Sequence, residues 1–264
     1  MRSQVSAHHV VITGASAGLG LALALAHAAS GMVLGLVGRD PLRIDAVATA
    51  CRASGATVET GIVDVRNTAA IGAWLDAFDA RYPITLLIAN AGVASTIASA
   101  DDWEESEHAR VVIDTNLYGM LNTVFPVIKR MRERRHGRIA VVASIAALRG
   151  MEISPAYCAS KSAIKAWADS VRPRLKRDGL AVTVILPGFV KTSMSDVFPG
   201  EKPFLWSAEH AAAHIRRKLE AGRSEIAFPA LLACGMRLLP LLPIALADAI
   251  LERLSYLPAK GHAN

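Results

Sequence analysis

Two residues that could exchange protons, Tyr157 and Lys161, lie four positions apart in the stretch SPAYCASKSAIK, residues 154–165. On a helix this spacing places both side chains on one face, one turn apart. A free tyrosine has a pKa of about 10, and a neighbouring ammonium group lowers that pKa by favouring the phenolate. The pair therefore predicts a tyrosine that acts as a general acid or base, provided that the chain builds a binding site beside it.

A glycine-rich segment near the N-terminus could supply that site. The β-branched run from His9 to Thr13 predicts a buried strand, and it leads directly into TGASAGLG, whose glycines are Gly14, Gly18 and Gly20. Glycines allow a tight turn and a close approach to a pyrophosphate, and the N-terminus of the following helix favours the negative charge. An ordinary glycine-rich turn is the alternative, but the strand-turn-helix context favours dinucleotide binding.

The remaining chain alternates between strands and helices. Such alternation predicts an α/β fold with one doubly wound parallel sheet of about seven strands and helices on both faces. We expect a single domain over 1–264, with a core over about 9–220 and an apolar C-terminal extension over 221–264. A long helical region over 102–135 should break near 116–119, and Pro173 predicts a kink or an early end of its helix. The strands are expected at 9–13, 32–37, 58–65, 84–89, 138–143, 181–186 and 225–228.

Composition excludes several classes of protein. With 52% hydrophobic and 20% charged residues the chain is typical of a globular enzyme, and a net charge of +6 is too small to indicate nucleic-acid binding. The three cysteines are far apart and predict neither disulfides nor a zinc site, which fits a reducing cytoplasm. We see no signal peptide, and no metal site is predicted, because His210 and His214 have no third ligand beside them.

Taken together, the motifs resemble those of the short-chain dehydrogenases/reductases. The resemblance covers about residues 9–220 and rests on TGASAGLG, ANAG at 89–92, Asn116, Ser144, YCASK at 157–161 and PG at 187–188. It implies a Rossmann-type sheet, a nicotinamide cofactor, interconversion of a carbonyl and a secondary alcohol, and a homodimer or homotetramer formed through the helices before and after Ser144. Ala89 departs from the pattern, because many members have a second Asn there.

The resemblance also implies roles for individual residues. Ser144 would bind the substrate oxygen, Tyr157 would transfer the proton, Lys161 would lower the tyrosine pKa and hold the nicotinamide ribose, and Asn116 would hold a proton-relaying water. The cofactor-binding residues implied are Gly14, Ser16, Gly18, Leu19, Gly20, Arg39, Asp64, Val65, Asn90, Ala91, Gly92, Tyr157, Lys161, Pro187, Gly188 and Thr192.

The end of the second predicted strand bears on the choice of cofactor. Enzymes that use NAD usually carry an acid at this point, whereas this chain has Gly38-Arg39-Asp40. Asp40 precedes Pro41 and is better explained as a helix N-cap. Arg39 is then free to meet a 2′-phosphate, so we expect NADPH to be preferred over NAD. Alternatively, Arg39 is an exposed arginine that binds no ligand. The alternative functions are an NAD-dependent alcohol dehydrogenase and a non-catalytic dinucleotide-binding regulator.

The last part of the chain is unusually apolar. A transmembrane span is not expected over 228–258, because Pro229, Pro240, Pro243, Arg237 and Asp248 interrupt the run. The segment could instead close over the active site as a lid that excludes water, or lie on a membrane surface. We favour the lid, which predicts a bulky, apolar small-molecule substrate.

Overall fold

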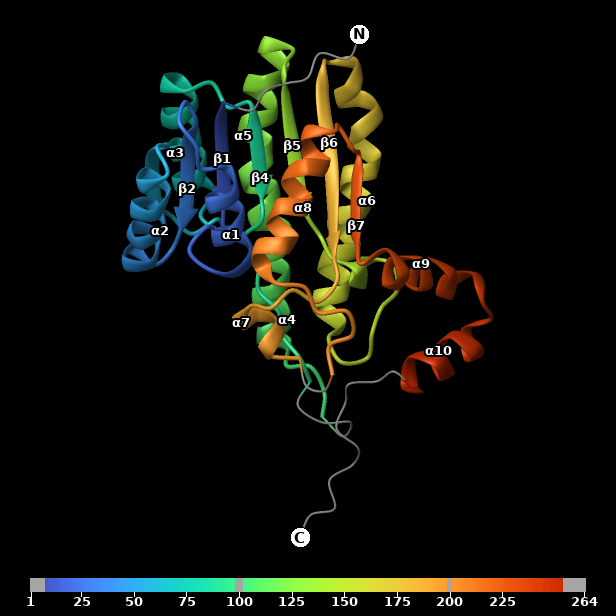
Figure 1. The fold of residues 1–264 in the computed structure, drawn as a ribbon. Helices are drawn as coiled ribbons and strands as arrows, with labels where there is room; N and C mark the ends of the chain where they lie inside the picture. Colours follow the sequence, from blue (N-terminus) through green and yellow to red (C-terminus); the bar gives the residue numbers. More distant parts are fainter. Residues whose placement is uncertain (1–7, 98–101, 199–200, 254–264) are drawn as a thin grey trace.

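One sheet of seven parallel strands forms the centre of the protein (Figure 1). The computed structural model describes residues 8–97, 102–198 and 201–253. The strand order is β3-β2-β1-β4-β5-β6-β7, and neighbouring strands all pair in parallel. The strands are β1 (His9–Thr13), β2 (Val33–Gly38), β3 (Thr57–Ile62), β4 (Leu86–Ala89), β5 (Gly137–Val142), β6 (Leu180–Pro187) and β7 (Glu225–Phe228).

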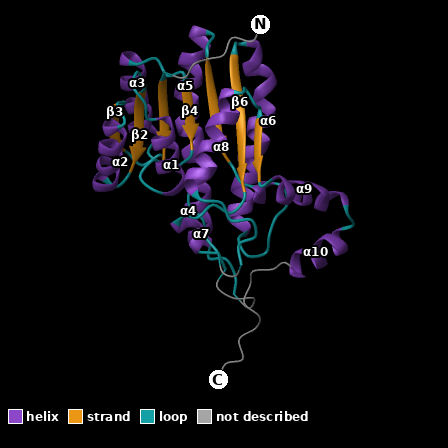
Figure 2. Cartoon of the chain, in the orientation of Figure 1, coloured by secondary structure: helices purple, strands orange, loops and turns teal. Residues whose placement is uncertain are grey.

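Helices cover both faces of this sheet, which confirms the predicted doubly wound α/β class (Figure 2). One face carries α1 (Gly18–His27), α2 (Pro41–Ala53) and α8 (Ala208–Glu220). The other face carries α3 (Thr68–Arg81), α5 (Gly119–Arg134) and α6 (Pro155–Arg177). The short helices α4 (Ser106–Ile113) and α7 (Ser193–Asp196) lie beyond the carboxyl ends of the strands.

The order of the strands creates a crevice at their carboxyl ends. The chain runs outward from β1 to β2 and β3, then returns to pair β4 with the other edge of β1. Open parallel sheets bind ligands at such a reversal, because the loops on its two sides lead away from each other. The segments that follow β1, β4, β5 and β6 therefore meet at one edge, and they begin with Gly14, Asn90, Ala143 and Gly188.

The sequence-based boundaries agree closely with the structure. The strands predicted at 9–13 and 225–228 have those bounds, and the other five differ by about one to three residues. The helical region predicted over 102–135 is interrupted by a π-helical turn, η1 (Asp114–Tyr118), which joins α4 to α5. Of the two outcomes predicted at Pro173, a kink or an early end, the early end does not occur, because α6 continues to Arg177. Residues on both sides of Pro173, including Ala168 and Leu175, are buried against the sheet, and this packing holds the helix together.

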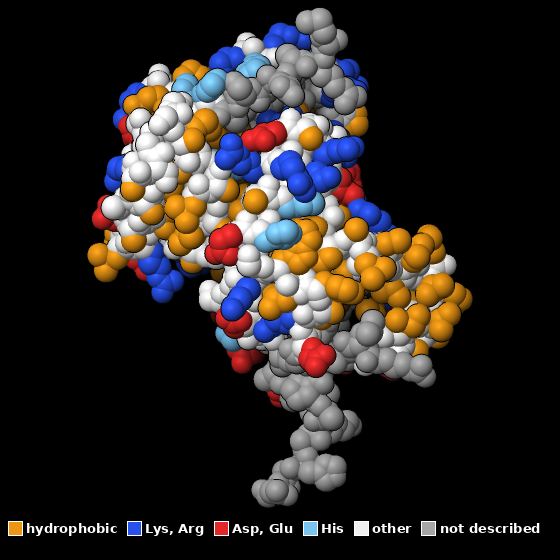
Figure 3. Space-filling model, in the orientation of Figure 1, with side chains coloured by type: hydrophobic (Ala, Val, Ile, Leu, Met, Phe, Trp, Pro, Cys, Tyr) orange, Lys and Arg blue, Asp and Glu red, His pale blue; other side chains and the backbone are white. Residues whose placement is uncertain are grey.

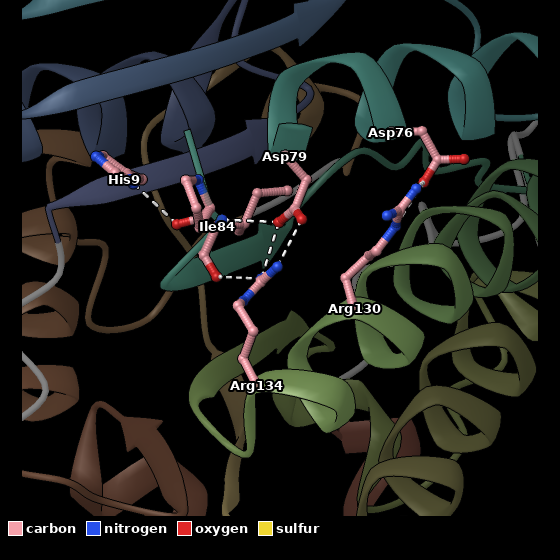
Figure 4. Close-up of polar contacts among 7 residues, drawn as sticks. His9, Asp76, Asp79, Ile84, Arg130 and Arg134 are labelled. Atoms are coloured by element: carbon pink, nitrogen blue, oxygen red, sulfur yellow. Dashed lines mark hydrogen bonds and ion pairs between the residues drawn. The ribbon is translucent and has the colours of Figure 1, made fainter. Parts of the chain in front are cut away.

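A buried acid ties α3 to α5 (Figure 4). The carboxylate of Asp79 accepts hydrogen bonds from Arg134 Nη1 and Nη2 at 2.6 and 2.8 Å, and from the Ile84 backbone N–H at 2.8 Å. Only 5% of Asp79 is exposed. The neighbouring pair of Asp76 and Arg130 is exposed, so the two ion pairs differ in burial and in their expected contribution to stability.

The apolar extension folds into two short helices beyond β7. These are α9 (Ala230–Leu238) and α10 (Ile244–Arg253), joined through the 3-10 turn η3 (Leu239–Leu241). Their inner face buries Ala233, Met236, Leu239 and Ala247. Figure 3 shows hydrophobic side chains gathered on the surface of this part of the protein. The exposed large hydrophobic residues of the extension are Leu231, Leu238, Leu241, Ile244 and Leu246.

Within the described ranges, one helical run is long and apolar enough to cross a bilayer. It spans Ser106–Arg134, which comprises α4, η1 and α5, and 44% of its most apolar window is buried. The apolar run of the extension, Ala230–Leu241, is shorter than a span requires.

Candidate active site

The glycine-rich loop after β1 depends on its glycines. Gly14 and Gly18 have φ angles of +67° and +53°, which side chains rarely allow. A Cβ atom on Gly20 would lie 2.0 Å from the Gly14 carbonyl oxygen. Helix α1 starts directly behind the loop with no acidic residue in its first turn, and Ala17 provides no side-chain cap. The N-terminal end of α1 thus remains suited to an anionic group such as a diphosphate.

The loop is fastened to the end of β4 by Thr13 and Asn90. The Thr13 hydroxyl accepts the backbone N–H groups of Asn90 and Ala91, both at 3.2 Å. In return, Asn90 Nδ2 donates to the carbonyl oxygens of Thr13 and Gly14 at 3.0 and 3.2 Å. The Asn90 side chain, which is expected to contact the cofactor, therefore also holds the glycine-rich loop in place. Sequence reasoning missed Thr13, although a hydroxyl residue at the last position of a buried strand is a signal for such a role.

Charged residues collect where β2 and β3 end. Arg39 Nη1 lies 3.8 Å from Asp64 Oδ2, and 61% of the Arg39 side chain is exposed. Hydrogen bonds from Arg66, at 2.7 Å for the shortest, hold the pKa of Asp64 below its usual value, and Arg39 adds to this effect. Asp64 does not cap α3, since Asn67 does so.

Asp40 is the N-cap of α2, as predicted, and accepts the Arg43 N–H at 3.1 Å. The carboxylate of Asp40 is consequently used to cap α2. Of the two charged residues Arg39 and Asp40, only Arg39 lines the cavity described below.

Tyr157 and Lys161 lie on the buried face of α6. The Lys161 Nζ atom is 5.6 Å from the centroid of the Tyr157 ring, and it donates to the Val142 carbonyl oxygen at 3.0 Å. The tyrosine ring also forms an edge-to-face pair with the ring of Phe198, with centroids 5.9 Å apart. The helical spacing read from the sequence thus brings the two side chains together beneath the end of β5.

The pKa values of this pair differ from the sequence-based expectation. Burial raises the pKa of Tyr157 to about 12, and a hydrogen bond with Ser144 lowers it only in part. Burial also lowers the pKa of Lys161 to about 8. The net pKa of Tyr157 is therefore raised and not lowered, because removal from water is the largest influence on it and Lys161 Nζ is directed at Val142. Tyr157 is held in its protonated form at neutral pH.

Ser144 lies directly after β5, beside Tyr157. Its Oγ accepts the Ala146 N–H at 3.1 Å and donates to the Pro187 carbonyl at 3.4 Å, a long hydrogen bond. The hydroxyl is therefore placed by β5 and β6 together, next to the phenol. Two hydroxyl groups that converge in this way can bind one carbonyl oxygen.

Asn116 lies inside the π-helical turn η1 and is fully buried. Its Oδ1 accepts the Val93 N–H at 2.8 Å, while Nδ2 donates to the Val93 carbonyl at 3.0 Å and to Ser160 Oγ at 2.9 Å. Both amide protons are thus used within the protein. A Cβ on Gly92 would lie 3.0 Å from Asn116 Oδ1 and 3.4 Å from Lys161 Nζ, so both side chains border Gly92.

The N-terminus of α6 is capped from a distant part of the chain. Ser154 provides no side-chain cap. Glu104 Oε2 instead accepts the Ala156 N–H at 2.9 Å, and its Oε1 accepts the Ser95 hydroxyl at 3.0 Å. This carboxylate, which sequence reasoning missed, joins the segment after β4 to the helix that carries Tyr157.

The segment after β6 closes the site from the other side. Gly188 donates its N–H to the Phe228 carbonyl at 2.7 Å, which fixes Pro187-Gly188 against β7. Thr192 forms a capping box with Ser195 at the start of α7. A Cβ on Gly18 would lie 3.0 Å from the Thr192 methyl carbon, so Thr192 faces the glycine-rich loop.

These segments enclose a continuous cavity of about 1140 Å³. Its lining includes every site residue implied by the sequence except Asn116, which lies behind Gly92, while its neighbour Thr115 lines the wall. One end reaches Arg39 and Asp64, and Ser144 and Tyr157 lie elsewhere on the wall. The apolar extension supplies Leu232, Met236 and Leu251 to the same cavity, and Arg149 binds Asp248 of α10 at 2.5 Å.

The cavity fits a nicotinamide dinucleotide. Its wall contains an uncapped helix N-terminus for a diphosphate and glycine backbones that leave no room for side chains. Thr115 adds a buried hydroxyl that has no hydrogen-bond partner. Among the described residues no group of three or more His, Cys, Asp or Glu side chains could hold a metal ion.

Comparison with known proteins identifies the family. The profile of the short chain dehydrogenase family matches residues 8–202. The chain belongs to the short-chain dehydrogenase/reductase family, and it is an oxidoreductase that acts on CH–OH and C=O groups with a nicotinamide dinucleotide.

Individual relatives cover most of the chain. An uncharacterized oxidoreductase of Myxococcus xanthus is 35% identical over 96% of this chain and 99% of its own length. A putative ketoacyl reductase of the monensin polyketide synthase from Streptomyces virginiae is 33% identical over 73% of this chain and 74% of its own. Among solved structures, a family member from Burkholderia phymatum in complex with NAD has a TM-score of 0.81 at 22% identity, covering 98% of this chain and 99% of that one.

Proposed function

We propose that the protein is an NADPH-dependent reductase of bulky, apolar ketones. The observation that carries this proposal is the single cavity that joins Arg39 to the pair of Ser144 and Tyr157 and that borders the apolar extension. The similarity to a putative ketoacyl reductase supports the direction of reduction. An NAD-dependent alcohol dehydrogenase is the alternative, and in such an enzyme Arg39 would not bind a 2′-phosphate.

The residues of the site have distinct tasks in this reaction. The bound cofactor supplies a hydride to the carbonyl carbon. Ser144 donates a hydrogen bond to the substrate oxygen, and Tyr157, protonated because its pKa is about 12, transfers its proton to that oxygen as the C=O π bond breaks. Lys161, still cationic at neutral pH, stabilises the phenolate left behind and binds the nicotinamide ribose. Asn116, which like Lys161 borders Gly92, holds a water that relays a proton from solvent to Lys161.

Replacing Tyr157 by Phe tests the proton transfer. The variant should lose about 10² to 10⁴-fold in kcat, because a general acid contributes about that factor. Folding and the Kd for NADPH should change little. Reduction of a proven substrate at a rate near that of the wild type would exclude Tyr157 as the acid.

The preference for NADPH depends on Arg39. A charge-assisted contact with the 2′-phosphate should make NADPH bind roughly 10- to 100-fold more tightly than NADH. Arg39→Ala should weaken NADPH binding and leave NADH binding nearly unchanged. Arg43→Ala is the matched control, since Arg43 pairs with Asp40 outside the cavity. Equal dissociation constants for the two cofactors in the wild type would refute the preference.

The choice of an apolar substrate depends on the extension acting as a lid. Leu232 lines the cavity, whereas Leu231, next to it on α9, is 70% exposed. Leu232→Ser should therefore lower kcat/KM for a long-chain ketone about tenfold more than for a short polar ketone. Leu231→Ser should affect both ketones equally. If Leu232→Ser changed kcat/KM for the two ketones by the same factor, the lid would not select the substrate.

The outer surface of α5 and α6 bears on the assembly of the protein. We propose a homodimer or homotetramer formed through α5 and α6, whose outer surface carries the ring pair of Phe125 and Trp167, with Phe125 55% exposed. Sedimentation analysis of the wild type and of Phe125→Glu tests this assembly.

We propose the cytoplasm as the compartment of the protein, which its three free cysteines support. Sedimentation with anionic liposomes tests the alternative, association with a membrane surface through 228–258.

A further inference from the structure

Two buried side-chain polar atoms among the described residues have no hydrogen-bond partner, Thr115 Oγ1 and Arg138 Nη1. Only the first lines the cavity. Thr115 is 6% exposed, and a buried hydroxyl without a partner destabilises a fold. A ligand that supplies the missing hydrogen bond would recover this loss when it binds.

The backbone explains why Thr115 is left without a partner. Within a helix a threonine hydroxyl commonly donates to the carbonyl of the preceding turn. Thr123 does so one element later, with its Oγ1 2.7 Å from the Gly119 carbonyl. Thr115 lies in the π-helical turn η1, and its hydroxyl has no such bond. Turns of this kind inside α-helices are frequent at functional sites.

The position of η1 indicates which part of the cavity the hydroxyl meets. Asn116, the next residue, is bonded to Val93 behind Gly92. The start of α5 packs on the other side against Val65, with Asn122 Nδ2 donating to the Val65 carbonyl at 3.0 Å. Thr115 therefore belongs to the wall formed by the segments after β3 and β4, which faces the glycine-rich loop.

We infer that Thr115 Oγ1 is a hydrogen-bonding contact to the sugar–phosphate part of the bound nicotinamide dinucleotide. A hydroxyl both donates and accepts, so it suits a ribose hydroxyl or a phosphate oxygen. The inference uses only the dinucleotide binding common to the family and is independent of Arg39 and of the substrate. It applies equally to NADPH and NADH.

The test compares the affinity for the cofactor with the melting temperature of the protein without cofactor. Thr115→Val keeps the shape of the side chain but removes the hydroxyl. It should weaken binding of both NADPH and NADH roughly 5- to 30-fold, the range expected for one lost hydrogen bond. The melting temperature without cofactor should stay equal or rise, because the unpaired group is gone. Cofactor fluorescence titration and thermal unfolding give the two readings without any substrate.

Matched variants separate this contact from a structural role. Thr123→Val removes a satisfied buried hydroxyl on the same helical run, so it should lower the melting temperature and leave cofactor binding unchanged. Thr115→Ser should retain wild-type affinity, and the pair Thr115→Ser and Thr115→Ala replaces the main comparison if Thr115→Val does not fold. Unchanged dissociation constants in Thr115→Val, or in Thr115→Ala in that case, would overturn the inference.

Fragments of the cofactor locate the contact. If the loss in affinity also appears with ADP, which lacks the nicotinamide ribose, the hydroxyl binds the adenosine diphosphate half. If the loss appears only with the whole dinucleotide, the hydroxyl binds the nicotinamide ribose. Both outcomes support the contact, and they place it on different ends of the wall.

Discussion

Replacing Lys161 by Met should stabilise the folded protein at neutral pH while it abolishes activity. Only 4% of Lys161 is exposed, and burial lowers its pKa from 10.5 to about 8. Below about pH 8 both the folded and the unfolded chain bind the proton, so the folded state carries the whole penalty of a buried ammonium group. Methionine keeps the length of the side chain and removes the charge.

The magnitude follows from the two pKa values. The difference between 10.5 and about 8 corresponds to about 3 kcal/mol of unfolding free energy near neutral pH. The variant also loses the hydrogen bond from Nζ to the Val142 carbonyl, which is worth about 1 kcal/mol. We therefore expect Lys161→Met to be more stable than the wild type by about 2 kcal/mol near neutral pH.

The dependence on pH provides the sharper test. Between about pH 8 and about pH 10 the unfolded chain binds more protons than the folded one, so the free energy of unfolding of the wild type rises with pH. Relative to Lys161→Met this rise should reach about 2 kcal/mol by about pH 10. Tyr157, with its pKa raised to about 12, acts in the opposite direction above about pH 10, so measurements stop there.

Urea unfolding of both proteins across that range measures the difference. Lys165→Met is the matched control, because Lys165 lies one turn further along α6 in an ion pair with Asp169 at 2.6 Å. It should cause a small loss of stability. If the stability difference between the wild type and Lys161→Met did not change with pH, the buried ammonium group would not be the source of the penalty.

Three further outcomes are expected. Gly20→Ala should destabilise the protein by about 1–3 kcal/mol in urea unfolding and weaken cofactor binding more than tenfold, since its Cβ would lie 2.0 Å from a carbonyl oxygen. Wild-type affinity in that variant would show that the loop tolerates a side chain. Glu104→Ala should lower kcat about tenfold at unchanged cofactor affinity, and Glu104→Gln should restore most of it, because the amide oxygen still accepts the helix N–H. Equal kcat in both variants would argue against a positioning role. Asp79→Ala should lose about 3–5 kcal/mol of stability and Asp76→Ala less than about 1 kcal/mol, and similar losses would contradict the difference in burial.

Features that depend on neighbours along the chain were readable from the sequence. The alternation of apolar runs and helical segments predicted the doubly wound sheet, since each element hides its own apolar face. The glycine-rich turn and the Tyr157–Lys161 spacing are local as well. So is the N-cap at Asp40, which needs only the residues that follow it.

Other features depend on contacts between distant residues. Glu104 caps a helix 52 positions away, and Asn90 bonds the glycine-rich loop across 77 positions. Nothing in the local sequence distinguishes Glu104 from a solvated acid, and the motif that marks Asn90 does not indicate its bonds to Thr13 and Gly14. The continuation of α6 through Pro173 has the same origin, because packing on the sheet overrides the local preference of proline to end a helix.

The electrostatics of the site were decided by tertiary structure alone. The sequence determined that a tyrosine and a lysine would share one helix face, and it indicated that the lysine would lower the tyrosine pKa. Folding buries both groups, and removal from water is the largest influence on each of them, raising the pKa of Tyr157 and lowering that of Lys161. The unpaired hydroxyl of Thr115 arises in the same way. Residue types and spacing are properties of the chain, whereas desolvation depends on every segment that packs around a group.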